Sequence, residues 1–332
     1  MLEVMEMEIL ASLTAKIANH YVKIVFPEGS DERIITAASR LAEDHLLTPI
    51  LLGETEVMLQ QAQKLGVDLA GCVLINPQKF ADLDRYAEAL YERRKGKMTI
   101  DEAQKLVRDV NYFGTMMVYL GEASGMVSGA IHSTGETVRP ALQIIKTKPN
   151  ISRVSGAFLM MRGDEKYIFA DCAINVNPSA QELAEIALES AKTAEMFDIK
   201  PNVALLSFST DGSAQAPEVT KVTEAVQIVQ DLNTNPNYHF DGEMQFDAAI
   251  NQKVAQLKMP NSQVAGDAKV FIFPSLEAGN IGYKIAQRLG NFEAVGPILQ
   301  GLNAPVSDLS RGCNADEVYK LSLITAAQAI MK

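Results

Sequence analysis

Several features that would reveal a function at once are absent from this chain of 332 residues. It has no tryptophan, only four histidines and only three cysteines, Cys72, Cys172 and Cys313. The cysteines are scattered and make neither a disulfide framework nor a metal knuckle. No apolar run approaches the ~20 residues of a membrane helix, and the N-terminus lacks a signal-peptide pattern. We therefore expect a cytoplasmic protein that contacts no membrane and holds no metal.

Positive charge is also scarce, since 30 Lys and Arg residues stand against 41 Asp and Glu residues, a net charge of −11. A nucleic-acid-binding protein needs a basic face, so no nucleic acid partner is expected. An anionic small substrate is still compatible, because a local arginine cluster can override a diffuse acidic field. The length favours two domains, and the composition, 47% hydrophobic and 21% charged, is that of a globular protein.

Strands and helices alternate along the first half of the chain. The short apolar segments Lys23–Phe26, Thr48–Leu52 and Cys72–Ile75 predict strands, and helical patterns separate them. One of these helices follows Ser30, with Ile34, Ile35, Ala38 and Leu41 at helical spacing. Such alternation indicates parallel βαβ units and an α/β fold.

A polar, proline-containing stretch, Lys146–Asn150, predicts a domain boundary. We expect the chain to return after about residue 298. One α/β domain then comprises 1–149 with 299–332, and the other comprises 150–298.

Within the second domain, Val154–Met161 and Tyr167–Ala170 predict an antiparallel pair at a sheet edge. Asp241–Asp247 is expected to open a helix, because carboxylates suit a first turn. Val270–Phe273 is expected to be the last strand of this half.

A loop near the C-terminus ends in Ser310, Arg311 and Gly312, and a helix pattern over Asp316–Met331 follows it. The N-terminus of a helix favours an anion, and an arginine fork suits a phosphoryl group better than a lysine does. The competing interpretation is a surface loop whose Arg311 pairs with a carboxylate.

Hydroxyl-rich loops offer further candidates. Ser209 and Thr210 follow a buried strand and would suit an anion-binding nest, although an ordinary polar loop has the same composition. The glycines around Ser128 form no dinucleotide fingerprint. Behind them a short strand at Ile131 is expected, and we expect Ser128 and Thr134 to contact substrate.

A basic cluster ends the helix pattern over residues 80–94, with Arg93 and Arg94 followed by two lysines. Such a cluster is usually a solvated helix end, favoured by the helix dipole. The functional alternative is a clamp for a multiply charged ligand.

Seven segments, taken together and in order, resemble the phosphate acetyltransferase (phosphotransacetylase) family over nearly the whole chain. They are Phe26–Arg33, Gly125–Ala130, His132–Thr134, Leu206–Ala214, Gly242–Ala248, Phe273–Asn280 and Pro305–Gly312. The resemblance implies two α/β domains flanking a cleft, as in isocitrate and isopropylmalate dehydrogenases, and usually a homodimer. It also implies reversible transfer of an acetyl group between acetyl phosphate and coenzyme A. Coenzyme A is then a substrate, and no cofactor is expected.

The resemblance assigns roles to particular residues. Ser310 matches the family serine that hydrogen-bonds the reacting groups, and Arg311 matches the arginine that holds the acyl phosphate. Arg139 and Arg94 match positions tied to the phosphates of coenzyme A, and the neighbouring Arg93 is the alternative to Arg94. The family is described as using direct thiolate attack in a ternary complex, so Cys313 would carry no acyl group.

The catalytic base departs from the family pattern, because the family places an aspartate seven positions after the motif serine and here that position is Glu317. Asp316 stands one residue earlier. Asn314 and Glu317 also fit a capping box, in which Glu317 turns back to the backbone of Asn314. We favour Glu317 as the base and keep Asp316 as the alternative.

Three other functions compete. A phosphate butyryltransferase shares the chemistry with a larger acyl group, and a non-catalytic acyl-CoA-sensing domain shares the fold. The presence of Ser310 and Arg311 favours catalysis. A metal-dependent hydroxyacid dehydrogenase follows from fold analogy alone and lacks a cluster of metal-binding aspartates.

Overall fold

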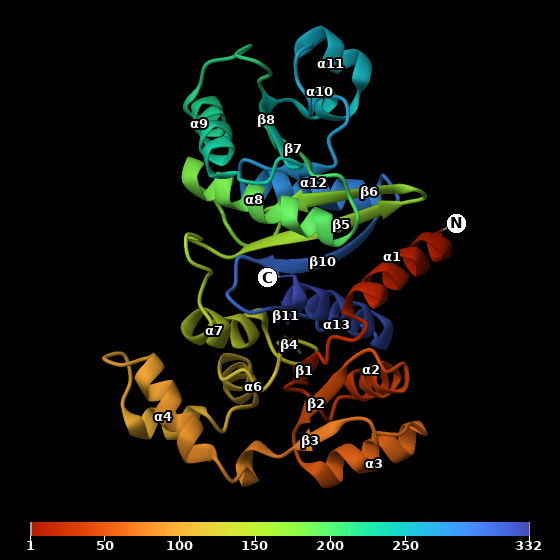
Figure 1. Ribbon diagram of the computed structural model, residues 1–332, viewed down its shortest axis with the longest axis vertical. Coiled ribbons are helices and arrows are strands. Elements are labelled where there is room, and N and C mark those ends of the chain that lie inside the picture. Colours follow the sequence, from red (N-terminus) through yellow and green to blue (C-terminus); the bar gives the residue numbers. More distant parts are fainter. Residues whose placement is uncertain (1, 332) are drawn as a thin grey trace. The chain divides into compact units, whose positions relative to one another are not determined.

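The computed structural model describes residues 2–331, with side chains from Ile9 onward, and the chain divides into two compact units (Figure 1). Unit I comprises Leu10–Thr147 and Leu302–Lys332, and unit II comprises Met1–Ile9 and Lys148–Gly301. The first helix, α1 (Leu2–Ile17), contributes residues to both. Nothing among the helices of 2–331 has the length and apolar character that crossing a membrane requires.

Unit I contains a sheet of five strands in the order β11-β4-β1-β2-β3, and every neighbouring pair is parallel. The strands are β1 (Lys23–Phe26), β2 (Thr48–Leu52), β3 (Val73–Ile75), β4 (Gly125–Ser128) and β11 (Val306–Asp308). Because they are parallel, their carboxyl ends meet at one edge of the sheet. The chain runs outward from β1 to β2 and β3, and then places β4 on the other side of β1. The topological switch point therefore lies between β1 and β4, where open α/β sheets bind ligands.

The helices of unit I cover both faces of this sheet. They are α2 (Glu32–Glu43), α3 (Thr55–Leu65), α4 (Leu83–Arg93), α5 (Ile100–Leu106), α6 (Val110–Tyr119), α7 (Thr134–Ile144) and α13 (Ala315–Ile330), with a short 3₁₀ turn, η1 (Pro77–Lys79). α2 packs against α13, and α6 packs against α7 on the opposite side of the sheet (Figure 1). The expected face of α2, which includes Ile34 and Leu41, is buried. Its cap is Asp31, one residue after the serine that the sequence suggested.

Unit II contains a mixed sheet in the order β10-β5-β6-β9-β7-β8. Its strands are β5 (Ser155–Arg162), β6 (Glu165–Ala170), β7 (Asn202–Leu206), β8 (His239–Met244), β9 (Val270–Ile272) and β10 (Glu293–Gln300). β5 pairs antiparallel with β6 and with β10, while β6, β9, β7 and β8 are joined by parallel pairs.

The helices of unit II are α8 (Ala180–Met196), α9 (Pro217–Leu232), α10 (Phe246–Ile250), α11 (Gln252–Lys258) and α12 (Leu276–Arg288). α8 packs against α9 and against the sheet, and α12 contacts β5, β6 and β10. The core between sheet and helices is aromatic, since Phe158 of β5 stacks on Tyr283 of α12 at a centroid distance of 4.3 Å. The predicted α/β class with parallel strands is confirmed.

The structure corrects several predicted elements of unit II. β5 and β6 form the predicted antiparallel pair, but not at a sheet edge, because β10 pairs with β5 outside them. Val270–Phe273 is therefore not the last strand of this half. Asp241–Met244 belongs to β8 rather than to a helix, and α10 begins only at Phe246.

Unit I contains two strands that the sequence patterns missed. The glycine-containing segment Gly125–Ser128 is itself β4, and Ile131 lies in the loop that follows it. A Cβ atom on Gly125 would come within 2.9 Å of Thr325 and 3.1 Å of Pro305, so this buried strand has no room for a larger residue. Val306–Asp308, expected to be a loop, forms β11 at the edge of the sheet.

Candidate active site

Three neighbouring strands of unit I, β11, β4 and β1, end beside one another at the switch point. β1 is followed by Glu28, β4 by the loop Gly129–His132, and β11 by Ser310 and Arg311. Residues that are far apart in the sequence therefore meet at one edge of the sheet. Only the last of these segments was assigned a role from the sequence.

Glu28 occupies the centre of this edge and its side chain is fully buried. Its Oε2 accepts hydrogen bonds from the N–H groups of Gly129 and Ala130 at 3.1 and 2.8 Å. Its Oε1 accepts from the N–H groups of Ile131 and His132 at 2.9 Å each, and lies 2.8 Å from Nδ1 of His132. Burial alone would raise the pKa of the Glu28 carboxyl, but these hydrogen bonds outweigh it and hold the pKa below its usual value. The backbone nest after β4 is thus filled by a carboxylate of the protein.

Gly129 allows this loop to approach β11. Its φ of +114° is a conformation that side chains disfavour. A Cβ atom there would lie 2.7 Å from Oδ1 of Asp308 and 2.6 Å from the carbonyl oxygen of Leu309. Asp308 is therefore a second acidic group close to this loop, and burial raises the pKa of its carboxyl.

Arg33 ties the loops of this edge together. Its Nε and Nη2 donate to the two carboxylate oxygens of Asp31 at 2.9 and 2.8 Å. Nη2 also donates to the carbonyl oxygen of Ala130 at 2.8 Å, while Nη1 donates to those of Arg311 at 2.8 Å and Cys313 at 3.1 Å. One guanidinium therefore holds the loop after β4 next to the loop after β11. Neither Arg33 nor Glu28 was singled out from the sequence, although both belong to the acidic segment that directly follows β1.

Ser310 and Arg311 lie exposed in the loop before α13. Ser310 Oγ accepts a hydrogen bond from the N–H of Gly312 at 3.2 Å. The cap of α13 is Asn314, so Arg311 precedes the helix by one short turn. Its guanidinium makes no hydrogen bond or ion pair with residues 9–331, so the predicted alternative, a carboxylate partner for Arg311, is not seen there. The group is free to bind an anion.

The two candidate bases both have partners. Glu317 and Asn314 form a capping box, in which Glu317 Oε2 accepts from the N–H of Asn314 at 3.0 Å and Asn314 Oδ1 accepts from the N–H of Glu317 at 2.9 Å. Asp316 Oδ1 accepts from Nη1 of Arg40 at 2.8 Å. Both carboxylates are exposed, so either group remains accessible to a ligand.

The arginine pair at the end of α4 separates into two environments. Arg93 donates from Nε to the carbonyl oxygen of Ile144 at 2.7 Å, and its guanidinium lies over the ring of Tyr119. It therefore completes the C-terminus of α7. Burial raises the pKa of the Tyr112 hydroxyl, and the positive charges of the exposed Arg139 and of Arg94 both oppose that rise. This arrangement supports the choice of Arg94 over Arg93 for a phosphate contact.

The hydroxyl candidates differ in accessibility. Ser128 is buried and donates to Oδ1 of Asn111 at 2.8 Å, whereas Thr134 is exposed in the first turn of α7. In unit II, Ser209 is buried and donates to Oε1 of Glu243 at 2.8 Å, and Thr210 Oγ1 is 3.2 Å from Oε1 of Gln245. Of this group, Thr134 alone is exposed.

The nest after β7 is filled in the same way as the nest after β4. Glu243 Oε1 accepts the N–H of Gly212 at 2.9 Å, together with the Ser209 hydroxyl. These contacts outweigh the effect of burial and lower the pKa of the Glu243 carboxyl. Among the described residues, no group of three or more His, Cys, Asp or Glu side chains could hold a metal ion.

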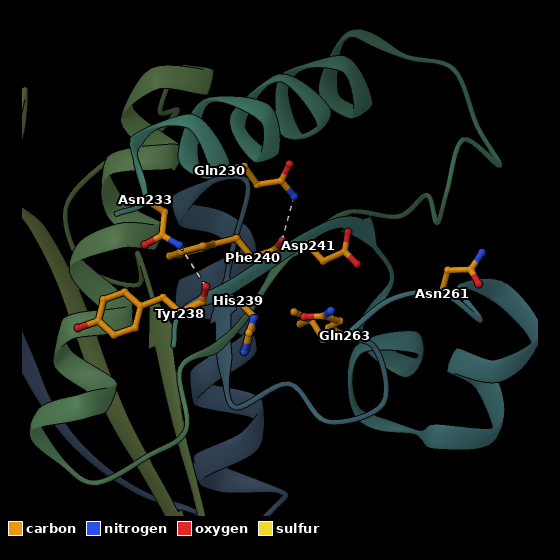
Figure 2. A pocket seen from close by; sticks show the side chains of 9 residues that line it. Gln230, Asn233, Tyr238, His239, Phe240, Asp241, Asn261 and Gln263 are labelled. Carbon is orange, nitrogen blue, oxygen red and sulfur yellow. Dashed lines mark hydrogen bonds between the residues drawn. The ribbon is translucent and has the colours of Figure 1, made fainter. Parts of the chain in front are cut away.

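Unit II also has a polar cavity of about 320 Å³, shown in Figure 2. It is lined by residues that include Gln230, His239, Asp241, Asn261 and Gln263. Gln230 Nε2 donates to the carbonyl oxygen of Phe240 at 3.1 Å, drawn as a dashed line in Figure 2. His239 is the first residue of β8, so this cavity lies at the amino end of that strand. None of the predicted site residues lines it.

Comparison with known proteins agrees with this geometry. Residues 8–326 match the family model described as "Phosphate acetyl/butaryl transferase". A phosphate acetyltransferase of Bacillus subtilis (strain 168) is 58% identical over 97% of this chain and 99% of its own length. A phosphotransacetylase of Streptococcus pyogenes has a TM-score of 0.95 at 58% identity, covering 98% of this chain and 99% of the other. The EutD phosphotransacetylase of Staphylococcus aureus has a TM-score of 0.94 at 57% identity, with the same two coverages.

The family resemblance inferred from the seven segments is confirmed by these matches, and with it the expectation of an acyltransferase. The chain belongs to the phosphate acetyl/butyryl transferase family.

Proposed function

We propose that this chain catalyses the reversible transfer of an acetyl group between acetyl phosphate and coenzyme A. The observation that carries the proposal is the exposed, unpaired guanidinium of Arg311 beside Ser310, at the carboxyl edge of a parallel sheet. The relatives with 57–58% identity over nearly the whole chain are named for this activity. Direct thiolate attack forms the carbon–sulfur bond as the carbon–oxygen bond to phosphate breaks.

The site residues then have distinct roles. Arg311 binds the phosphoryl oxygens through its planar fork, and Ser310 hydrogen-bonds the reacting groups. Glu317, or alternatively Asp316, takes the proton of the coenzyme A thiol. Burial raises the pKa of the Cys313 thiol, which disfavours the thiolate and supports a mechanism without an acyl-enzyme.

Coenzyme A is expected to reach this site past Arg94 and Arg139, with Thr134 as a further polar contact. The phosphates of coenzyme A keep their charge during the reaction, so these arginines contribute uniform binding. Ser128, Ser209 and Thr210 are the remaining candidate substrate contacts, and their hydroxyls already donate to protein partners.

The activity is tested by following loss of the coenzyme A thiol on addition of acetyl phosphate. Rapid loss with acetyl phosphate and slow loss with butyryl phosphate is the expected result. Preference for butyryl phosphate would favour the butyryltransferase alternative. Binding of acetyl-CoA without any thiol consumption would favour a sensing domain.

A homodimer is supported by an apolar stripe along α12 and the residue that caps its C-terminus, Leu289. Ile281, Ile285 and Leu289 recur at four-residue spacing and are 57%, 53% and 81% exposed. Such a stripe usually marks an interaction surface. Light scattering of the wild type and of Ile285→Asp tests this, with a dimer expected for the first and a monomer for the second. The free thiols of Cys72, Cys172 and Cys313 support a cytoplasmic location.

A further inference from the structure

His132 is a titratable residue of this edge to which the proposed function assigns no role. Its Nδ1 lies 2.8 Å from Oε1 of Glu28, and its side chain is 22% exposed. An ionised carboxylate can only accept a hydrogen bond, so Nδ1 carries the hydrogen and Nε2 is the nitrogen left for chemistry. Nε2 has no hydrogen-bond partner among residues 9–331, whose side chains the structure describes.

The contacts of Arg33 show how His132 lies relative to the loop that carries Ser310 and Arg311. The same guanidinium donates to Ala130, two residues before His132, and to the carbonyl oxygen of Arg311. The imidazole therefore belongs to the loop that lies against the Ser310–Arg311 loop. Four backbone hydrogen bonds to Glu28 hold that loop in one conformation.

The chemistry of acetyl transfer requires a proton on the departing phosphate. When the carbon–oxygen bond of acetyl phosphate breaks, the departing oxygen carries a negative charge that one proton converts to hydrogen phosphate. A general acid beside that oxygen typically accelerates such a step by about 10²–10⁴-fold.

We propose that His132 is this general acid, with Nε2 donating a proton to the departing phosphate oxygen and Glu28 orienting the ring through Nδ1. The inference rests on the proposed function. The thiol proton passes to the carboxylate base and the His132 proton passes to phosphate, and both groups then exchange protons with solvent. In the reverse direction, neutral His132 accepts the proton of hydrogen phosphate as its oxygen attacks the thioester.

The surroundings favour the protonated imidazole. The hydrogen bond to Glu28 raises the pKa of His132, burial opposes this, and the carboxylates of Glu28, Glu136 and Asp109 add to it. Synthesis of acetyl-CoA should therefore slow as the pH rises through this raised pKa, because the acid loses its proton. Synthesis of acetyl phosphate should slow as the pH falls through it, because the neutral base is lost.

Two substitutions separate catalysis from structural support. His132→Asn places an amide nitrogen where Nδ1 lies, so the bond to Glu28 is kept and Nε2 is removed. His132→Gln keeps a hydrogen-bond donor near Nε2 that cannot titrate. The matched control is His45→Asn, since His45 is exposed and has a φ of 54°, a conformation that asparagine accepts.

The experiment compares the turnover of these variants with that of the wild type, in both directions, between about pH 5.5 and 9. This range extends roughly one unit below and two to three units above the ordinary pKa of histidine. His132→Asn should melt at the wild-type temperature and turn over at least about 100-fold more slowly. The turnover of His132→Asn should also lose the two opposite pH dependences, the slowing of acetyl-CoA synthesis at high pH and of acetyl phosphate synthesis at low pH. His45→Asn should match the wild type.

Other outcomes would overturn the inference. Turnover of His132→Asn within a few-fold of the wild type would make His132 a structural partner of Glu28. If His132→Asn fails to fold, His132→Gln decides. An unchanged pH dependence of turnover in His132→Gln would show that another group, and not His132, causes that pH dependence. An inactive wild type would instead refute the proposed function itself.

Discussion

Replacing Glu28 with glutamine should destabilise unit I strongly, because the carboxylate accepts hydrogen bonds on both oxygens. Oε2 serves Gly129 and Ala130, while Oε1 serves Ile131, His132 and the imidazole. The amide of Glu28→Gln can present only one oxygen, so its NH₂ group must face at least two N–H donors. Each hydrogen bond to a charged group contributes about 1.5–3 kcal/mol, so the expected loss is roughly 3–6 kcal/mol at pH 7.

The pH dependence of this loss has a definite sign. The pKa of Glu28 is lowered from 4.5 in the folded protein, so its stabilisation is present above 4.5 and is lost as the pH falls through the folded value. The difference between wild type and Glu28→Gln should therefore shrink below about pH 4.5.

Urea unfolding measures the free energy of unfolding of the wild type and of Glu28→Gln at about pH 7, 5 and 4. These values span roughly the ordinary carboxyl pKa. The control is Glu54→Gln, because Glu54 is exposed and its side chain makes no capping bond at the start of α3. That control should change stability by less than about 0.5 kcal/mol. Equal stability of Glu28→Gln and wild type at pH 7, or a difference that does not depend on pH, would refute the reasoning.

Three further predictions concern the site. Arg311→Lys should lower turnover by about 10²–10³-fold with an unchanged melting temperature, because the guanidinium has no partner among residues 9–331; a parallel loss of stability would contradict this. Arg139→Ala should raise KM for coenzyme A with little change in kcat, whereas Arg93→Ala should lower the melting temperature, since Arg93 bonds the end of α7. Glu317→Gln should reduce turnover more than Asp316→Asn, and its stability should hold, because glutamine also completes a capping box; the opposite order of activities would identify Asp316 as the base.

Local patterns in the sequence were sufficient for much of the first half of the chain. The strands at residues 23–26 and 48–52 were predicted with the observed bounds, because short apolar runs between amphipathic helices leave little alternative. The spacing Thr99-x-x-Glu102 also suffices to predict the capping box that the structure shows, since its partners are three residues apart. The family was recognisable because its motifs keep their order along the chain.

The tertiary structure decided the features that depend on distant partners. β11 and β10 exist as strands because β4 and β5 supply their hydrogen bonds. Neither the three residues of β11 nor the glycine- and proline-containing sequence of β10 reveals such a partner. Glu28 meets its four N–H donors more than 100 residues later, and Arg33 meets the carbonyl of Arg311 278 residues later. A side chain's donors and acceptors are fixed by its type, but which of them remain free for substrate depends on the neighbours that folding brings. That is why the sequence identified Arg311 as a candidate, whereas only the folded chain brings Arg33, Glu28 and His132 together beside it.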